Sequence, residues 1–123
     1  MSASATRSIV VGVSRMESAL ELFRDVMGLQ LEAQWTAGTD LRRLWGLPEG
    51  NGVRLAELSC KGYSFGRLVL AQYEPGARTR VRLDHGPSAT DGPLDIGPKA
   101  IDFYVADPIG DALGKVVAAG YPA

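Results

Sequence analysis

The sequence predicts an α+β domain built from two strand–helix units, of which the first continues into three more strands and the second is cut short. Three observations support this prediction. A β-branched strand followed by an amphipathic helix occurs near residues 7–28 and again near residues 100–120. Segments with strand character lie between the two units, at 29–35, 53–59 and 66–73. Repetition of one strand–helix unit indicates two related modules.

Length and composition restrict the class of protein. A chain of 123 residues is long enough for one hydrophobic core. Its 46% hydrophobic content is typical of soluble globular proteins, and a net charge of −1 does not favour nucleic acid or an anionic membrane as a partner. We find no apolar run near the roughly 20 residues of a membrane helix and no secretory signal pattern. The single cysteine, Cys60, fits a reducing compartment, so we expect a cytoplasmic protein.

The first strand–helix unit is defined by its residue pattern. Residues 7–13 read Arg-Ser-Ile-Val-Val-Gly-Val, which is typical of a buried strand. Ser14 and Glu17 have the spacing of a capping box, which predicts that the helix begins directly after Ser14. Apolar residues at helical spacing continue to Val26, and Gly28 is expected to end the helix.

Three further strands are predicted after this helix. Residues 29–35 alternate between apolar and polar side chains, which predicts a strand with one solvent-exposed face. Residues 36–52 form a longer excursion that contains a possible short helix at Leu41–Leu47. Two more strands are expected at 53–59 and 66–73, so the order of elements is β-α-β-β-β.

The composition changes between residues 76 and 98, where Gly, Pro, Asp and Arg predominate. A segment of this length predicts a linker or a lid. Residues 100–105 then predict a strand, and a helix with an apolar face follows and ends at Gly120. We therefore divide the chain into a first module at 1–75, a linker or lid at 76–98, and the start of a second module at 99–123.

The residues around the first helix resemble the signature of a known family. The stretch VGVSRMESALELFRDVMGL, from Val11 to Leu29, resembles the strand–helix signature of the vicinal-oxygen-chelate superfamily, which includes glyoxalases, bleomycin-resistance proteins and dioxygenases. Residues 66–75 look like the fourth strand of that family's first module, and residues 101–108 look like the start of its second. The resemblance implies paired βαβββ modules around a cupped pocket, with the second module incomplete in this chain.

The resemblance also implies where metal ligands would lie. Metal-dependent members place a His on the first strand, a Glu on the fourth, and two further ligands in the second module, leaving open positions on a divalent ion. In this chain the first-strand position is Ser8, the fourth-strand position is Val69 or Ala71, and the second-module His position is Ala100. None of these side chains is expected to bind a divalent ion. We therefore predict a protein without a metal or other cofactor.

The predicted ligand-binding residues come from several parts of the first module. Ser8 faces the pocket if it takes the place of the family's histidine, and Tyr73 faces it by alternation along the fourth strand. Trp35 and Trp45 are candidate walls for an aromatic or hydrophobic ligand, or they pack the excursion against the sheet. Arg54 could hold a carboxylate or phosphate, or it lies on a solvent-exposed strand face.

Two residues of the second module are predicted to be catalytic. Alternation places Asp102 and Tyr104 on the pocket side of an otherwise apolar strand. A partly buried carboxylate can act as a general base, and a phenol can donate a hydrogen bond to a ligand oxygen. The alternatives are that Asp102 pairs with an arginine or lies at a subunit seam, and that Tyr104 belongs to the core.

These residues support two main functions. The first is a metal-independent enzyme of the isomerase or lyase type that acts on a small hydrophobic or aromatic metabolite, with Asp102 as the base. The second is a non-catalytic small-molecule binding protein, such as a drug or antibiotic resistance protein. A third is a role in dimerisation or in regulation of a partner. Because the second module lacks its last strands, we expect either a fragment or a homodimer in which another chain completes the sheet.

Overall fold

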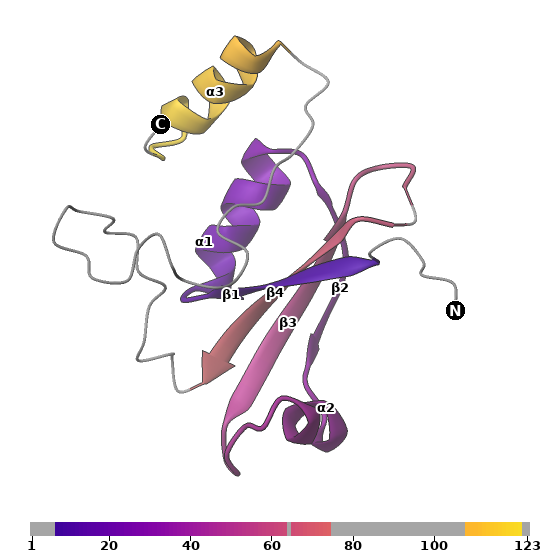
Figure 1. Ribbon diagram of the computed structural model, residues 1–123. Coiled ribbons are helices and arrows are strands. Elements are labelled where there is room, and N and C mark those ends of the chain that lie inside the picture. Colours follow the sequence, from indigo (N-terminus) through magenta and orange to yellow (C-terminus); the bar gives the residue numbers. More distant parts are fainter. Residues whose placement is uncertain (1–6, 64, 75–107, 122–123) are drawn as a thin grey trace, which may run out of the picture.

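The computed structural model describes residues 7–63, 65–74 and 108–121 (Figure 1). The predicted linker and the predicted strand at 100–105 lie outside the described residues. The elements, in chain order, are β1 (Ser8–Val13), α1 (Met16–Leu20), η1 (Glu21–Val26), β2 (Gln30–Thr36), α2 (Thr39–Leu44), β3 (Gly52–Ser59), β4 (Arg67–Glu74) and α3 (Ile109–Ala118).

The four strands form one sheet in the order β1-β4-β3-β2. Strand β1 pairs with β4 in parallel, whereas β3 is antiparallel to both β4 and β2. The pairing of β2 with β3 is irregular between Leu31 and Ala33, where the register shifts. The α+β class and the β-α-β-β-β order of the first module are therefore confirmed.

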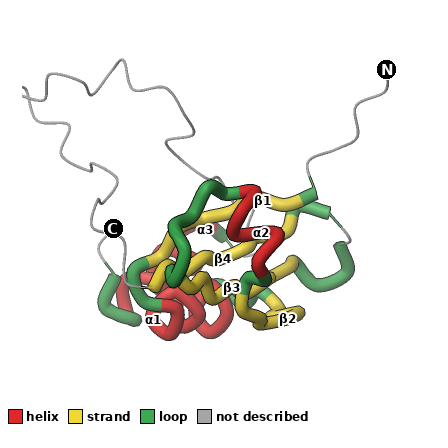
Figure 2. The backbone as a smooth tube through the Cα atoms, turned by 90° about the horizontal axis from the view of Figure 1, so that it is seen from below, coloured by secondary structure: helices red, strands yellow, loops and turns green. Residues whose placement is uncertain are grey.

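Different helices cover the two faces of the sheet. Figure 2 shows α1 and α2 on opposite sides of the strands. Helix α3 contacts η1, and the Tyr121 hydroxyl, just beyond α3, donates a hydrogen bond of 3.2 Å to the carbonyl of Ser18. We call the side that carries α1 the helix face and the other side the open face. The helix face carries Ala56, Leu58, Leu68 and Leu70, and the open face carries Val53, Leu55, Val69 and Ala71.

Both faces of the two central strands are apolar, which gives the fold two hydrophobic clusters. On the helix face, Met16 and Leu20 from α1 are buried against the leucines of β3 and β4. On the open face, Leu41 and Trp45 from the α2 region pack against the smaller cluster. Tyr73 belongs to that cluster as well, so it lies on the same face of β4 as Val69 and Ala71.

Helix α1 begins at a different residue, and with a different cap, from those predicted. The N-cap is Arg15, which makes no side-chain capping hydrogen bond, so the predicted capping box at Ser14 is wrong. Instead, the backbone N–H of Met16 donates to the side-chain Oε1 of Gln72 at 2.7 Å, across 56 positions of sequence. Strand β4 therefore supplies the hydrogen-bond acceptor for the Met16 amide, in place of a capping side chain close in sequence. The predicted end is confirmed, because Gly28 adopts a φ of +79°.

We expect Gln72→Leu to lower the free energy of unfolding by about 1 kcal/mol, which is the usual cost of losing a helix cap. Leucine has a similar volume but leaves the Met16 amide without its acceptor. Gln72→Glu keeps an acceptor at the same place and serves as the control. Urea denaturation followed by circular dichroism measures both variants. Equal midpoints for the wild-type and leucine proteins would contradict the proposed cap.

The second half of the predicted first helix is a π-helix. In η1 the turn is wider than in an α-helix, and the backbone N–H of Met27 donates to the carbonyl of Leu22 at 2.9 Å. The N–H of Leu29 then donates to the carbonyl of Phe23 at 3.0 Å, which leads the chain into β2. The predicted single amphipathic helix is therefore an α-helix that continues as a π-helix.

Helix α3 confirms the predicted helix of the second strand–helix unit. Pro108 is its N-cap, and Gly120 follows its end with a φ of +87°. Three apolar residues at helical spacing remain exposed, namely Ile109, Leu113 and Val117. Among the described residues, no helix is both long enough and apolar enough to span a membrane.

Candidate functional site

The open face of the sheet has an apolar part and a polar part. Val53 and Leu55 on β3 and Val69 and Ala71 on β4 are buried and form the apolar part. Glu57, two residues beyond Leu55, begins the polar part. Side chains two apart in a strand share a face, so the change from apolar to polar occurs along one surface.

Two aromatic rings lie over the apolar part. The ring centroids of Trp45 and Tyr73 are 6.4 Å apart, and the ring planes are tilted by 46°. The Cε2 atom of Tyr73 would be 3.8 Å from a Cβ placed on Gly12, so the phenol ring reaches across to β1. A tilted pair at this distance is a favourable aromatic arrangement.

The chain around α2 positions Trp45. The N–H of Ala37 donates to the carbonyl of Val53 at 2.8 Å, which holds the chain before α2 against β3. Arg42 in α2 donates to the carbonyl of Asn51 at 3.3 Å, which closes the excursion on its other side. Trp45 follows directly at the C-cap of α2. The excursion therefore holds the indole against the open face.

An ion pair dominates the polar part. Nη1 of Arg67 lies 2.9 Å from Oε2 of Glu57, and the two side chains are 25% and 21% exposed. Partial removal from water strengthens the attraction between the charges. The Nε atom of Arg67 is buried and has no hydrogen-bond partner among the described residues. Further along β3, the Ser59 hydroxyl donates to the carboxylate of Glu32.

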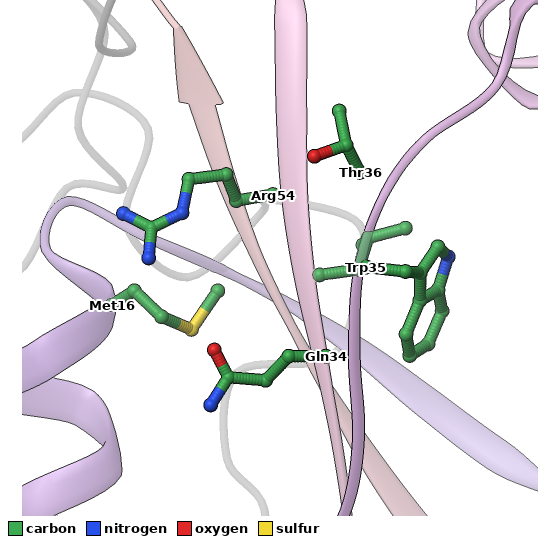
Figure 3. A pocket seen from close by; sticks show the side chains of 6 residues that line it. Met16, Gln34, Trp35, Thr36 and Arg54 are labelled. Atoms are coloured by element: carbon green, nitrogen blue, oxygen red, sulfur yellow. The ribbon is translucent and has the colours of Figure 1, made fainter.

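Four of the five predicted ligand-binding residues lie on the open face. Tyr73 and Trp45 form the aromatic pair, and Ser8 on β1 is paired with Arg67 on β4, at the polar part. Trp35 is paired with Leu55, and Figure 3 shows its indole pointing away from the helix face.

Arg54 is separated from these residues. It lies on the helix face, where its Nη1 donates to Oε1 of Glu17 at 3.2 Å. The predicted catalytic residues Asp102 and Tyr104 lie outside the described residues, so their roles remain predictions.

The first-module positions at which the family binds metal do not fit a divalent ion here. Val69 and Ala71 are buried apolar residues, and Ser8 is paired with Arg67, whose positive charge opposes binding of a cation. Across residues 7–63, 65–74 and 108–121, no group of three or more His, Cys, Asp or Glu side chains gathers to hold a metal.

Arg67 and Glu57 were not among the residues predicted from the sequence to form the site. The available signal was that each is a charged residue in a largely apolar strand, and that their charges are opposite. Such a pair is recognised only when the two strands are known to be neighbours. In the structure Glu57 is paired with Val69, which places it diagonally opposite Arg67.

The structure is similar to a solved glyoxalase family protein from Bacillus cereus. The TM-score is 0.64, the similarity covers 97% of this chain and 74% of that protein, and 17% of the residues are identical. No family profile matches the sequence, and no curated protein matches it significantly. At this identity, the similarity describes the fold.

Proposed function

We propose that this chain, which has the fold of glyoxalase family proteins of the vicinal-oxygen-chelate type, binds a small hydrophobic or aromatic molecule on its open face without a metal ion. The observation that carries the proposal is the aromatic pair Trp45–Tyr73 on the same face as the ion pair Arg67–Glu57. Ligand pockets are typically apolar surfaces with a few oriented polar groups.

The two parts of the open face have different roles in this proposal. Contact with Trp45 and Tyr73 contributes about 0.5–1.5 kcal/mol per aromatic pair beyond the burial of apolar area. A hydrogen bond from Arg67 to a ligand carbonyl or carboxylate contributes about 1.5–3 kcal/mol, because the donor is charged. The polar contact therefore determines which end of the ligand points toward Arg67. An aromatic acid or an aromatic ketone has both features.

The catalytic form of this proposal is an isomerase or lyase. It depends on Asp102 as general base and Tyr104 as hydrogen-bond donor, and it acts on a ligand held by the same face. The alternative is a drug or antibiotic binding protein without turnover. Asp102→Asn tests the catalytic form, since an enzyme that uses Asp102 as its base loses turnover while it retains affinity for the ligand. A binding protein shows no turnover before or after the substitution. A homodimer and a cytoplasmic location stay predictions.

Replacing Tyr73 tests the binding site. We expect Tyr73→Ala to weaken binding of an aromatic carboxylate such as 2-naphthoate about tenfold, because one ring contact is removed. Tyr63→Ala is the matched control, since Tyr63 is 61% exposed and its ring contacts Phe65 and not the Trp45–Tyr73 pair. Isothermal titration calorimetry measures both affinities, and circular dichroism confirms folding.

Two results would contradict the proposed binding site. The first is equal affinity of the Tyr73→Ala and wild-type proteins for 2-naphthoate. The second is an absence of heat from the wild-type protein with 2-naphthoate and with its neutral methyl ester. If only the methyl ester binds, the aromatic pair is still a binding site for apolar ligands, but Arg67 does not bind the ligand carboxylate.

A further inference from the structure

A hollow lies on the helix face, beside the start of α1 (Figure 3). Its volume is about 210 Å³, which is smaller than the roughly 300–1,000 Å³ of pockets for drug-sized ligands. It therefore suits a small ion or one end of a larger molecule. The lining residues are Met16, Gln34, Trp35, Thr36, Arg54 and Leu55.

Strand register brings three hydrogen-bonding side chains to this hollow. Thr36 on β2 is paired directly with Arg54 on β3. Gln34 is paired with Ala56, which follows Arg54 on the same face of β3. Figure 3 shows Gln34, Thr36 and Arg54 around one space with Met16 beside it, whereas the indole of Trp35 points away. The buried side chain of Met16 supplies an apolar wall.

The charges around the hollow are positive on balance. The side chain of Arg54 is 41% exposed, and its ion-pair partner Glu17 is 72% exposed. The pKa of Glu17 is lowered, first by a hydrogen bond from its own backbone N–H, then by the hydrogen bond from Arg54, and also by the charges of Arg54 and Arg15. Two guanidinium groups, of Arg54 and Arg15, therefore act on one carboxylate, and that carboxylate is largely exposed to solvent.

We propose that this hollow binds a small oxyanion, a phosphate or carboxylate group, through the guanidinium of Arg54, the side-chain amide of Gln34 and the hydroxyl of Thr36. All three groups can donate hydrogen bonds, and a guanidinium matches the paired oxygens of either anion. Glu17 acts as an internal competitor, because its carboxylate occupies Arg54 when no ligand is bound. This site is separate from the open face and does not depend on the function proposed there.

The competition gives two variants with effects of opposite sign. Arg54→Leu removes the charged donor and is expected to abolish binding of inorganic phosphate and of malonate. Glu17→Gln removes the competing charge and is expected to tighten binding by about two- to fivefold, which corresponds to the usual strength of an exposed ion pair. Gln34→Leu removes one donor and is expected to weaken binding without abolishing it.

The measurement is a titration of isotope-labelled protein with inorganic phosphate or malonate, at constant ionic strength, followed by nuclear magnetic resonance. Saturable shifts are expected at the Arg54 Nε–H and the Gln34 side-chain amide. Arg24→Gln is the matched control, because Arg24 is also an arginine paired with a carboxylate, Asp25, but does not line the hollow. It should leave both affinities unchanged.

The outcomes separate the two sources of the anion and can overturn the site. Tighter binding of phosphate than of malonate assigns the hollow to a phosphorylated ligand, and the reverse order assigns it to a carboxylic acid. The proposal is overturned if neither anion gives saturable shifts, or if Arg54→Leu binds as the wild type does. Weaker binding by Glu17→Gln would also overturn it, since the competitor would then be a ligand contact.

Discussion

Leu70→Ala is expected to lower the free energy of unfolding by about 2–5 kcal/mol. Leu70 is 0% exposed and lies in β4, one of the two central strands, in the cluster beneath α1. Truncation removes buried apolar surface and leaves a cavity that the surrounding sheet cannot close fully. A loss of this size is a large fraction of the roughly 5–15 kcal/mol that stabilises a typical domain. Urea denaturation followed by circular dichroism measures it.

The control for this prediction is the same substitution on the surface. Leu44 in α2 is 79% exposed, so Leu44→Ala should change the free energy of unfolding by less than about 0.5 kcal/mol. If Leu70→Ala does not fold, the milder Leu70→Val replaces it, with an expected loss of about 1 kcal/mol. A core variant as stable as the surface variant would show that Leu70 is not in a packed core.

Arg67→Met is expected to destabilise the protein by about 1–3 kcal/mol, because it leaves Glu57 half-buried without its partner. The range lies below that of a fully buried pair, since water still reaches about a quarter of each side chain. The double variant Glu57→Gln/Arg67→Met removes both charges and should regain most of the lost stability.

A double-mutant cycle with urea denaturation measures this coupling. Arg24→Met provides the comparison, because its partner Asp25 is exposed and the pair should contribute little. Additive effects of the Arg67 and Glu57 substitutions would mean that the ion pair does not stabilise the open face. The polar part of the open face would then contribute to ligand binding and not to stability.

The parts of the fold that were predicted from the sequence are set by local residue patterns. The β-branched run of β1 and the alternation in β2 depend on neighbouring residues only. The same is true of Gly28 and Gly120, which have positive φ angles and follow the ends of η1 and α3. These features are encoded within a few positions, so one sequence suffices to find them.

The parts that were missed depend on contacts between distant residues. The acceptor at the start of α1 is Gln72, which no inspection of residues near Ser14 could indicate. Arg54 was grouped with Tyr73, although the two lie on opposite faces of the sheet. Strand β3 carries both apolar and polar residues on each of its faces, so its alternation has no wholly polar side that would have assigned Arg54 to one of them.

The candidate site shows the same division. Trp45 and Tyr73 were predicted because large aromatic residues near a pocket-forming strand are visible in the sequence. The ion pair of Arg67 with Glu57 was not, because its two members lie on separate strands and only their pairing brings the charges together. The roles of Asp102 and Tyr104 rest on alternation along a strand outside the described residues and stay predictions.

The parallel pairing of β1 with β4 has a consequence for the way in which the chain folds. Strands β2, β3 and β4 follow one another, and each pairs with its neighbour in sequence, whereas β1 pairs only with β4, the last of the four in the chain. Closing this longer loop costs more chain entropy and slows folding. Of the four strands, we therefore expect the first to be synthesised to be the last to join the sheet. Until it does, the edge of β4 is open to pairing with other chains, which is when aggregation of this protein is most favoured.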